Sequence, residues 1–313
     1  MQVQWYPGHM TKARRAMQED IKLVDLVIEL LDARAPLSSR NPDIDELGRQ
    51  KARLIILNKA DLADARANKA WEIYFEDKGC TVVQVDARRR ADMKPIQAAI
   101  LSACREKIER DRRRGIKNRP VRAMVVGIPN VGKSTFINSY AGRACAKTGN
   151  RPGVTRGNQW IRLSKDVELL DTPGILWPKF EDQEVGIRLA MLGSIKDDIL
   201  NTDELSMRLL DCLSARYPEA LKERYQLPEE AYGKGPAEIL AEVARLRNCL
   251  LKGSELDYGK AARMVIEDFR CGRPVSYTHL YNLPACFCQD VIWKFLFGVS
   301  PLDWFSFLSR KNT

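Results

Sequence analysis

The feature that most constrains the fold is the segment 127–134, whose sequence GIPNVGKS matches the pattern G-x-x-x-x-G-K-[S/T]. The apolar, valine-rich run 121–126 precedes it and predicts a buried strand, and residues 134–140 can begin a helix. In a strand, glycine loop and helix of this kind, backbone N–H groups and the helix N-terminus cradle phosphate. The sequence therefore predicts a phosphate-binding loop (P-loop).

Two side chains of this loop have specific expected roles. Lys133 should reach the β- and γ-phosphates and assist catalysis, and the hydroxyl of Ser134 should bind Mg²⁺. The other residues expected to contact the nucleotide here are Asn130, Val131, Gly132 and Thr135.

A second phosphate motif follows the predicted strand 167–170. In the sequence DTPG, Asp171 should hold Mg²⁺ through water, and the amide of Gly174 should sense the γ-phosphate. Between the two motifs, Thr155 is the candidate switch threonine that closes on the nucleotide and Mg²⁺. A threonine in a loop can also be purely structural.

The base-recognition motif NKAD occupies residues 58–61, after the apolar run 53–57. Asp61 is suited to guanine, because one carboxylate accepts both the N1–H and the exocyclic amine. Asn58 should tie this loop to the P-loop, and the stem of Lys59 should cover the base. Further along, the run 82–85 predicts the last strand of the nucleotide-binding fold. The loop that backs the base should then hold Asp86, where a serine is usual, and Ala87.

The base-recognition half of this site precedes the phosphate half, although a standard GTPase has the opposite order. The original chain ends must therefore be joined, and residues 105–122 are the candidate joint. That segment has nine basic and three acidic residues, a net charge of +6. It is either a solvated surface or a contact with a phosphate backbone.

The alternation of strands and helices predicts an α/β domain with a mostly parallel sheet: a circularly permuted P-loop GTPase domain over residues 1–178. Helical spacing takes over from about residue 181. It predicts a smaller all-α domain over 179–272, with buried faces at 205, 209, 210 and 213 and at 239, 243, 246 and 250. Its candidate RNA contacts are Lys222, Arg224, Arg245, Arg247, Lys252, Lys260 and Arg263.

Four stretches together resemble one family. They are WYPGHM at 5–10, NKAD at 58–61, GIPNVGKS at 127–134 and DTPGILWP at 171–178. In these, the chain is similar to the YlqF/RbgA family of circularly permuted GTPases over roughly residues 3–272.

The resemblance implies a GTP-hydrolysing assembly factor for the large (50S) ribosomal subunit. Such a factor would bind GTP or GDP and pre-ribosomal rRNA, hold the precursor in its GTP state, leave after hydrolysis, and be monomeric off the ribosome. The alternative is a GTP-dependent protein or membrane-surface switch without a ribosomal role.

The catalytic group is less evident from sequence. Many GTPases have a glutamine directly after Asp-x-x-Gly, but this chain has Ile175. His9, within the family motif at 5–10, is the candidate that orients water or stabilises charge; it could instead fix a turn or contact RNA. Asn130 resembles the asparagine of GTPases that use K⁺ as an extra charge, or it caps a helix.

Composition agrees with a polyanionic partner. The formal charge of +10 and pI near 9.2 favour nucleic acid first and an anionic membrane surface second. With no apolar run of eighteen residues, we expect a cytoplasmic protein without a membrane span. The eight cysteines form no Cys-x-x-Cys pair and should be reduced.

Residues 273–313 do not fit the family. They contain many aromatic residues and few charges, and His279, Cys286 and Cys288 lack a fourth metal ligand. We expect an atypical tail that is foreign to the family or disordered.

Overall fold

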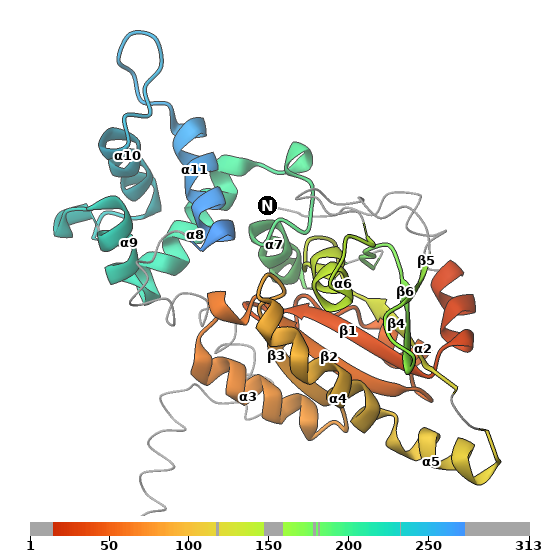
Figure 1. Ribbon diagram of the computed structural model, residues 1–313. Helices are drawn as coiled ribbons and strands as arrows, with labels where there is room; N and C mark the ends of the chain where they lie inside the picture. Colours follow the sequence, from red (N-terminus) through yellow and green to blue (C-terminus); the bar gives the residue numbers. More distant parts are fainter. Residues whose placement is uncertain are drawn as a thin grey trace, which may run out of the picture. The chain divides into compact units, whose positions relative to one another are not determined.

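A computed structural model describes residues 15–116, 119–146, 159–177, 180, 182–231 and 233–272 (Figure 1). His9, Thr155 and the predicted tail 273–313 lie outside the described residues. The chain forms two compact units. One, the sheet unit, contains the described residues up to 60 and from 68 to 196; the other, the helical unit, contains 61–67 and 197–272.

The sheet unit is built on six strands. Their order is β3-β2-β1-β4-β6-β5, and every neighbouring pair is parallel except β5 and β6. The strands are β1 (Leu26–Asp32), β2 (Ala52–Asn58), β3 (Thr81–Val85), β4 (Val121–Val126), β5 (Gln159–Arg162) and β6 (Val167–Asp171). The predicted mostly parallel α/β sheet is confirmed.

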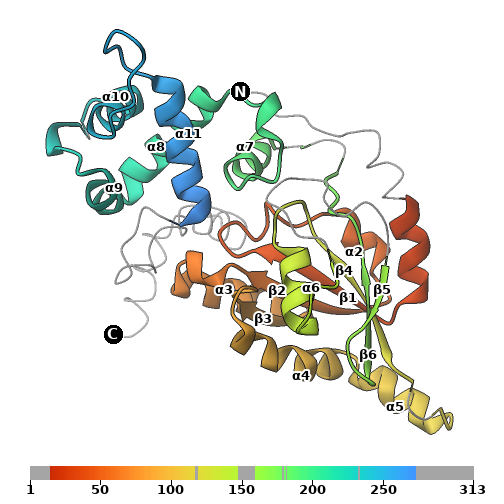
Figure 2. The same cartoon turned by 45° about the horizontal axis from the view of Figure 1, so that its top comes forward.

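Helices cover both faces of the sheet, as Figure 2 shows. On one face, Met17 and Ile21 from the N-terminal helical segment pack with Ile44 against Val27 and Met124. On the other, α4 packs against β2 and β3. The described helices of this unit are the helical segment 15–20, α2 (Asp43–Leu47), α3 (Ala65–Glu76, whose first three residues fall in the other unit), α4 (Lys94–Ala103), α5 (Arg105–Arg113), α6 (Lys133–Ala141) and α7 (Gln183–Met191).

The strand order places the site. From β1 the chain moves outward through β2 to β3, whereas from β4 it moves outward on the other side. The loops that leave β1 and β4 therefore diverge, which opens a crevice at the carboxyl ends of the parallel strands. Asp32, Asn58, Gly127 and Thr172 all lie at or directly after these strand ends.

The helical unit contains α8 (Thr202–Arg216), α9 (Pro218–Tyr225), α10 (Pro236–Leu246) and α11 (Tyr258–Cys271). The side chains of Asn201 and Asp257 cap the first turns of α8 and α11. The predicted apolar face of α8 is buried, but Leu246 and Leu250 are 44% and 46% exposed, so that part of the second prediction was wrong. For Leu250 the reason is that α10 ends at Leu246, and helical spacing no longer applies beyond it.

A buried ionic cluster joins α9 to α11. The guanidinium of Arg224 donates to both carboxylate oxygens of Asp268, at 2.9 and 3.1 Å, and the hydroxyl of Tyr225 donates to the same carboxylate at 3.0 Å. Arg247 donates to the carbonyl of Arg224. Arg224 and Arg247, which sequence suggested as RNA contacts, are therefore only partly exposed and serve packing within this unit.

The boundary between the two compact units falls between residues 196 and 197, so α7 belongs to the sheet unit. The domain boundaries predicted from the sequence, at residue 178 for the GTPase domain and at residue 272 for the all-α domain, stay predictions. Among the described helices, none is both long enough and apolar enough to cross a membrane. The six described cysteines are free thiols.

Candidate nucleotide-binding site

The P-loop connects β4 to α6 and depends on a glycine at its end. Gly132 has φ of 91° and directly precedes α6. A Cβ atom there would lie 2.4 Å from the Nδ2 atom of Asn58. Any larger residue would therefore both strain the backbone and push the base-recognition motif away from the P-loop.

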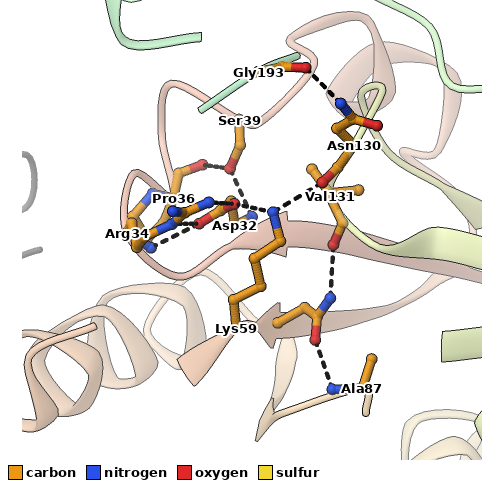
Figure 3. Close-up of polar contacts among 10 residues, drawn as sticks. Asp32, Arg34, Pro36, Ser39, Lys59, Ala87, Asn130, Val131 and Gly193 are labelled. Atoms are coloured by element: carbon orange, nitrogen blue, oxygen red, sulfur yellow. Dashed lines mark hydrogen bonds and ion pairs between the residues drawn. The ribbon is translucent and has the colours of Figure 1, made fainter. Parts of the chain in front are cut away.

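Asn58 joins three segments at the carboxyl edge of the sheet. Its Nδ2 donates to the carbonyl of Val131 at 2.6 Å, and its Oδ1 accepts from the N–H of Ala87 at 2.9 Å (Figure 3). This is the tie to the P-loop that the sequence predicted for Asn58. Contact of these residues with a nucleotide stays a prediction.

Lys59 lies between the P-loop and the end of β1. Its Nζ donates to the carbonyl of Asn130 and to Oδ2 of Asp32, both at 2.9 Å (Figure 3). Asp32 in turn accepts two hydrogen bonds of 2.8 Å from the guanidinium of Arg34, and both side chains are only 2% exposed. One buried carboxylate thus holds two cations.

The electrostatics of this group follow from its burial. Burial opposes ionisation of Asp32, but Arg34 and Lys59 outweigh it and hold the pKa of the carboxyl well below its usual range. The carboxylate therefore stays ionised at neutral pH and fixes the ammonium of Lys59. The N–H of Asp32 also donates to Oγ of Ser39 at 3.0 Å, which anchors the loop after β1.

Sequence reasoning missed Asp32 and Arg34. The available signal was their position: they are charged residues at the end of a fully buried strand, and that strand neighbours the one ending in Asn58. Parallel strands bring their carboxyl ends to one edge of a sheet, so their charges had to meet the loop of Lys59.

Lys133 and Asp171 form the centre of the phosphate half. Lys133 begins α6, and its Nζ lies 3.5 Å from Oδ1 of Asp171, with both side chains almost fully buried. Burial lowers the pKa of Lys133 in spite of Asp171, and burial raises the pKa of Asp171 in spite of Lys133. Each charge is therefore poorly stabilised by its present surroundings.

This pair fits the metal and phosphate that the motifs imply. Oδ1 of Asp171 is buried, and beyond its ion pair of 3.5 Å with Lys133 it has no hydrogen-bond partner among the described residues. A hard divalent cation near this oxygen, and phosphate oxygens near Lys133, would stabilise both charges. The hydroxyl-bearing Ser134 follows Lys133 in the first turn of α6.

The segment 171–175 packs directly on the P-loop. A Cβ atom on Gly174 would lie 2.9 Å from the N atom of Pro129, and the N–H of Ile175 donates to the carbonyl of Gly127 at 3.3 Å. Oγ1 of Thr172 donates to the carbonyl of Val125 at 2.8 Å. Ile175 is only 4% exposed and belongs to the apolar core, so this position offers no group to a water molecule.

Asn130 has a left-handed backbone, with φ of 63°, and its Nδ2 donates to the carbonyl of Gly193 at 2.6 Å. Gly193 comes two residues after α7, so this bond connects the P-loop to the end of that helix. No side-chain cap forms at the start of α6, where Gly132 is the cap residue. The amide nitrogen of Asn130 thus makes this connection, and the helix-capping alternative stays a hypothesis.

The other predicted residues are placed as follows. The carboxylate of Asp86 accepts hydrogen bonds of 2.9 and 3.1 Å from the guanidinium of Arg88, which holds the pKa of Asp86 below its usual range despite burial. The carbonyl of Ala87 accepts a hydrogen bond from Oγ of Ser139. Asp61 lies in the short 3-10 turn Ala60–Leu62, directly after Lys59 in the chain. Thr135 occupies the first turn of α6.

Comparisons with known proteins agree with this geometry. A family profile described as "50S ribosome-binding GTPase" matches residues 122–225. Ribosome biogenesis GTPase A of Bacillus cereus is 50% identical over 93% of this chain and 97% of its own. Mitochondrial ribosome-associated GTPase 1 of Mus musculus is 34% identical over 86% of this chain and 87% of its own.

A solved structure of a related protein is also similar to this chain over most of its length. The crystal structure of GNP-bound YlqF from Thermotoga maritima covers 87% of this chain and 100% of its own, with 25% identity and a TM-score of 0.58. The similarity to the B. cereus protein extends over almost the full length of both chains. The chain therefore belongs to the ribosome biogenesis GTPase A family, and it is a GTPase.

Proposed function

We propose that this protein is a GTP-hydrolysing assembly factor for the large (50S) ribosomal subunit, which binds precursor rRNA with GTP and leaves after hydrolysis. The observation that carries the proposal is the double hydrogen bond of Asn58. It unites the base-recognition and phosphate halves at one sheet edge although their order in the chain is reversed. The names of its relatives, which refer to ribosomes, support the partner.

In this proposal the guanine base lies over the stem of Lys59, between Asp61 and the loop of Asp86 and Ala87. The phosphates contact the backbone of Asn130, Val131 and Gly132 and the first turn of α6, including Thr135. Lys133 binds the β- and γ-phosphates, and the amide of Gly174 donates to the γ-phosphate. Specificity for GTP over ATP comes from the carboxylate of Asp61.

Mg²⁺ supplies positive charge to the β- and γ-phosphate oxygens when it is bound. Ser134, Thr155 and, through water, Asp171 are the residues that would hold it. The buried oxygen of Asp171 without a hydrogen-bond partner among the described residues supports this assignment.

Hydrolysis needs a group that orients water, and Ile175 is buried in the apolar core. We assign this task to His9, whose imidazole can accept a hydrogen bond from water. We further assign to Asn130 the binding of K⁺, which would add positive charge between the phosphates.

A short series of contacts connects the proposed γ-phosphate site to the end of α7. Gly174 packs on Pro129, the chain continues from Gly174 towards α7, and Asn130 holds the carbonyl of Gly193 just beyond α7. Losing the γ-phosphate would loosen Gly174 and so the segment that leads into the helical unit. We expect the protein to act in the cytoplasm, without a membrane and as a monomer off the ribosome.

The first prediction tests the function itself. Large-subunit precursor particles should retain the protein in sedimentation with a non-hydrolysable GTP analogue and release most of it with GDP, because GDP lacks the γ-phosphate that the amide of Gly174 would contact. Equal sedimentation with both nucleotides would contradict the proposed cycle. Mature large subunits serve as the control for precursor preference.

A second prediction concerns the carboxylate that fixes Lys59. Asp32→Asn should weaken both GDP and GTP binding by about tenfold or more, a cost of ~1.4 kcal/mol, because Lys59 loses its charged partner. Titration with a fluorescent guanine nucleotide measures this. Asp45→Asn is the matched control, since Asp45 also pairs with two arginines, Arg40 and Arg53, but is 55% exposed. Unchanged affinity in Asp32→Asn would refute the positioning role.

A third prediction separates chemistry from binding at His9. His9→Ala should lower the turnover that precursor particles stimulate by about a hundredfold, the scale of a general-base contribution, while GTP affinity stays the same. Single-turnover hydrolysis and equilibrium titration give the two quantities. A parallel loss in both would exclude the catalytic role.

The fourth prediction addresses the monovalent cation. At constant ionic strength, GTP hydrolysis should be faster in KCl than in NaCl, and Asn130→Ala should remove the difference. Rates that do not depend on the cation in the unsubstituted protein would exclude K⁺ as a cofactor.

A further inference from the structure

We propose an RNA-binding surface, which we term the basic pole, that runs from the end of α5 past the start of β4 to the edge strand β5: Arg112, Arg113, Arg114, Arg122, Trp160 and Arg162. The inference rests on the proposed function, because it specifies how the protein holds its ribosomal RNA partner. In both views α5 extends away from the amino ends of the parallel strands, far from the P-loop edge (Figures 1 and 2).

The last turn of α5 presents uncompensated positive charge. Two of the helix's three acidic residues are already engaged, since Glu109 pairs with Arg105 at 3.0 Å and Asp111 pairs with Lys107 at 2.6 Å. Arg112, Arg113 and Arg114 are exposed and make no salt bridge within the part of the chain that the structure describes. Exposed guanidinium groups of this kind suit phosphate oxygens, which they bind through two parallel N–H donors.

A buried carboxylate fixes α5 to the start of β4. Asp25, whose side chain is 7% exposed, accepts ion pairs of 3.4 Å from both Lys107 and Arg119. It also accepts a hydrogen bond of 3.1 Å from the N–H of Arg122. Asp25 therefore anchors both the base of α5 and the start of β4 at the same end of the sheet.

An exposed aromatic ring completes this surface. Trp160 is 42% exposed, and the guanidinium carbon of Arg122 lies 5.4 Å from its ring centroid. Arg162 is two residues further along β5 and thus on the same face of the strand, opposite Glu168. Glu168 is the acidic residue of this face, and Arg122 pairs with it at 3.4 Å.

The combination favours RNA over other polyanions. Arginines alone would serve an anionic lipid surface or an acidic protein equally well. An accessible indole ring beside guanidinium groups matches unpaired bases, which stack on aromatic side chains and arginine planes while phosphates bind the flanking cations. We therefore assign Trp160 to a base and the arginines to the backbone of a single-stranded or looped RNA segment.

The test measures binding of the full chain to large-subunit precursor particles, with a GTP analogue, over a range of salt concentrations. The triple substitution Arg112→Gln, Arg113→Gln and Arg114→Gln should weaken binding at least about tenfold. It should also reduce the slope of log affinity against log salt by about two, since each lost phosphate contact contributes somewhat less than one. The control removes the same charge from Arg49, Lys78 and Lys94, which are exposed elsewhere on the sheet unit, and should change little.

Trp160 is tested separately. Trp160→Ala should weaken binding about tenfold without changing the salt slope, and Trp160→Phe should restore most of the affinity, because stacking on a base is not electrostatic. Intrinsic GTP binding and hydrolysis should stay unchanged in the α5 triple variant, since α5 lies at the opposite end of the parallel strands from the nucleotide loops.

The outcomes distinguish the inference from the proposed function. Suppose that the wild-type protein binds precursors. If the α5 triple variant and the control triple variant then both keep this binding, or both lose it equally, the basic pole is overturned but the assembly role stays intact. Failure of the wild-type protein itself to bind precursors would overturn the assembly role. Loss of binding to anionic phosphatidylglycerol vesicles in the α5 variant, with RNA binding unchanged, would reassign the pole to a lipid surface and so refute the inference.

Discussion

The nucleotide site depends above all on the hydrogen bonds of one carboxamide. Asn58 is 2% exposed and donates to the P-loop while it accepts from the loop after β3, so three segments distant in sequence share one anchor. A buried amide with both ends satisfied is costly to displace, because each group would lose its partner away from water. Gly132 is part of the same constraint, since only a residue without Cβ lets Asn58 approach so closely.

Around this anchor the charges are arranged in two contrasting ways. In the base half, Asp32 has Arg34 and Lys59 as partners, and its low pKa records their combined attraction, although burial lowers the pKa of Lys59. The phosphate half is incomplete, because burial disfavours the charged forms of both Lys133 and Asp171. Phosphate oxygens near Lys133 and a cation near Asp171 would stabilise these two charged forms.

The parallel strands could be predicted because each is a short apolar run, and β1, β4 and β6 are buried over nearly their whole length. β5 could not, since it has four residues and is a strand only through its pairing with β6. The motif residues were likewise predictable. The contact of Asp32 and Arg34 with the base-recognition loop, in contrast, becomes evident only when β1 lies beside β2. The exposure of Leu250 escaped prediction for a related reason: where α10 stops is decided locally, and the apolar spacing continues beyond it.

Reversing the order of the two halves also dictates what lies at the far end of the sheet. After β3 and α4, the chain must return to the amino end of β4, and α5 with the segment to Val121 makes that connection. A joint there cannot use the core of the sheet, so its stability comes from Asp25, which holds Lys107, Arg119 and the start of β4. The buried carboxylate of Asp25 pairs with only some of the basic residues of the joint. Arg112, Arg113 and Arg114, which make no salt bridge with a carboxylate of the described chain, face solvent at the end of the sheet opposite the nucleotide loops.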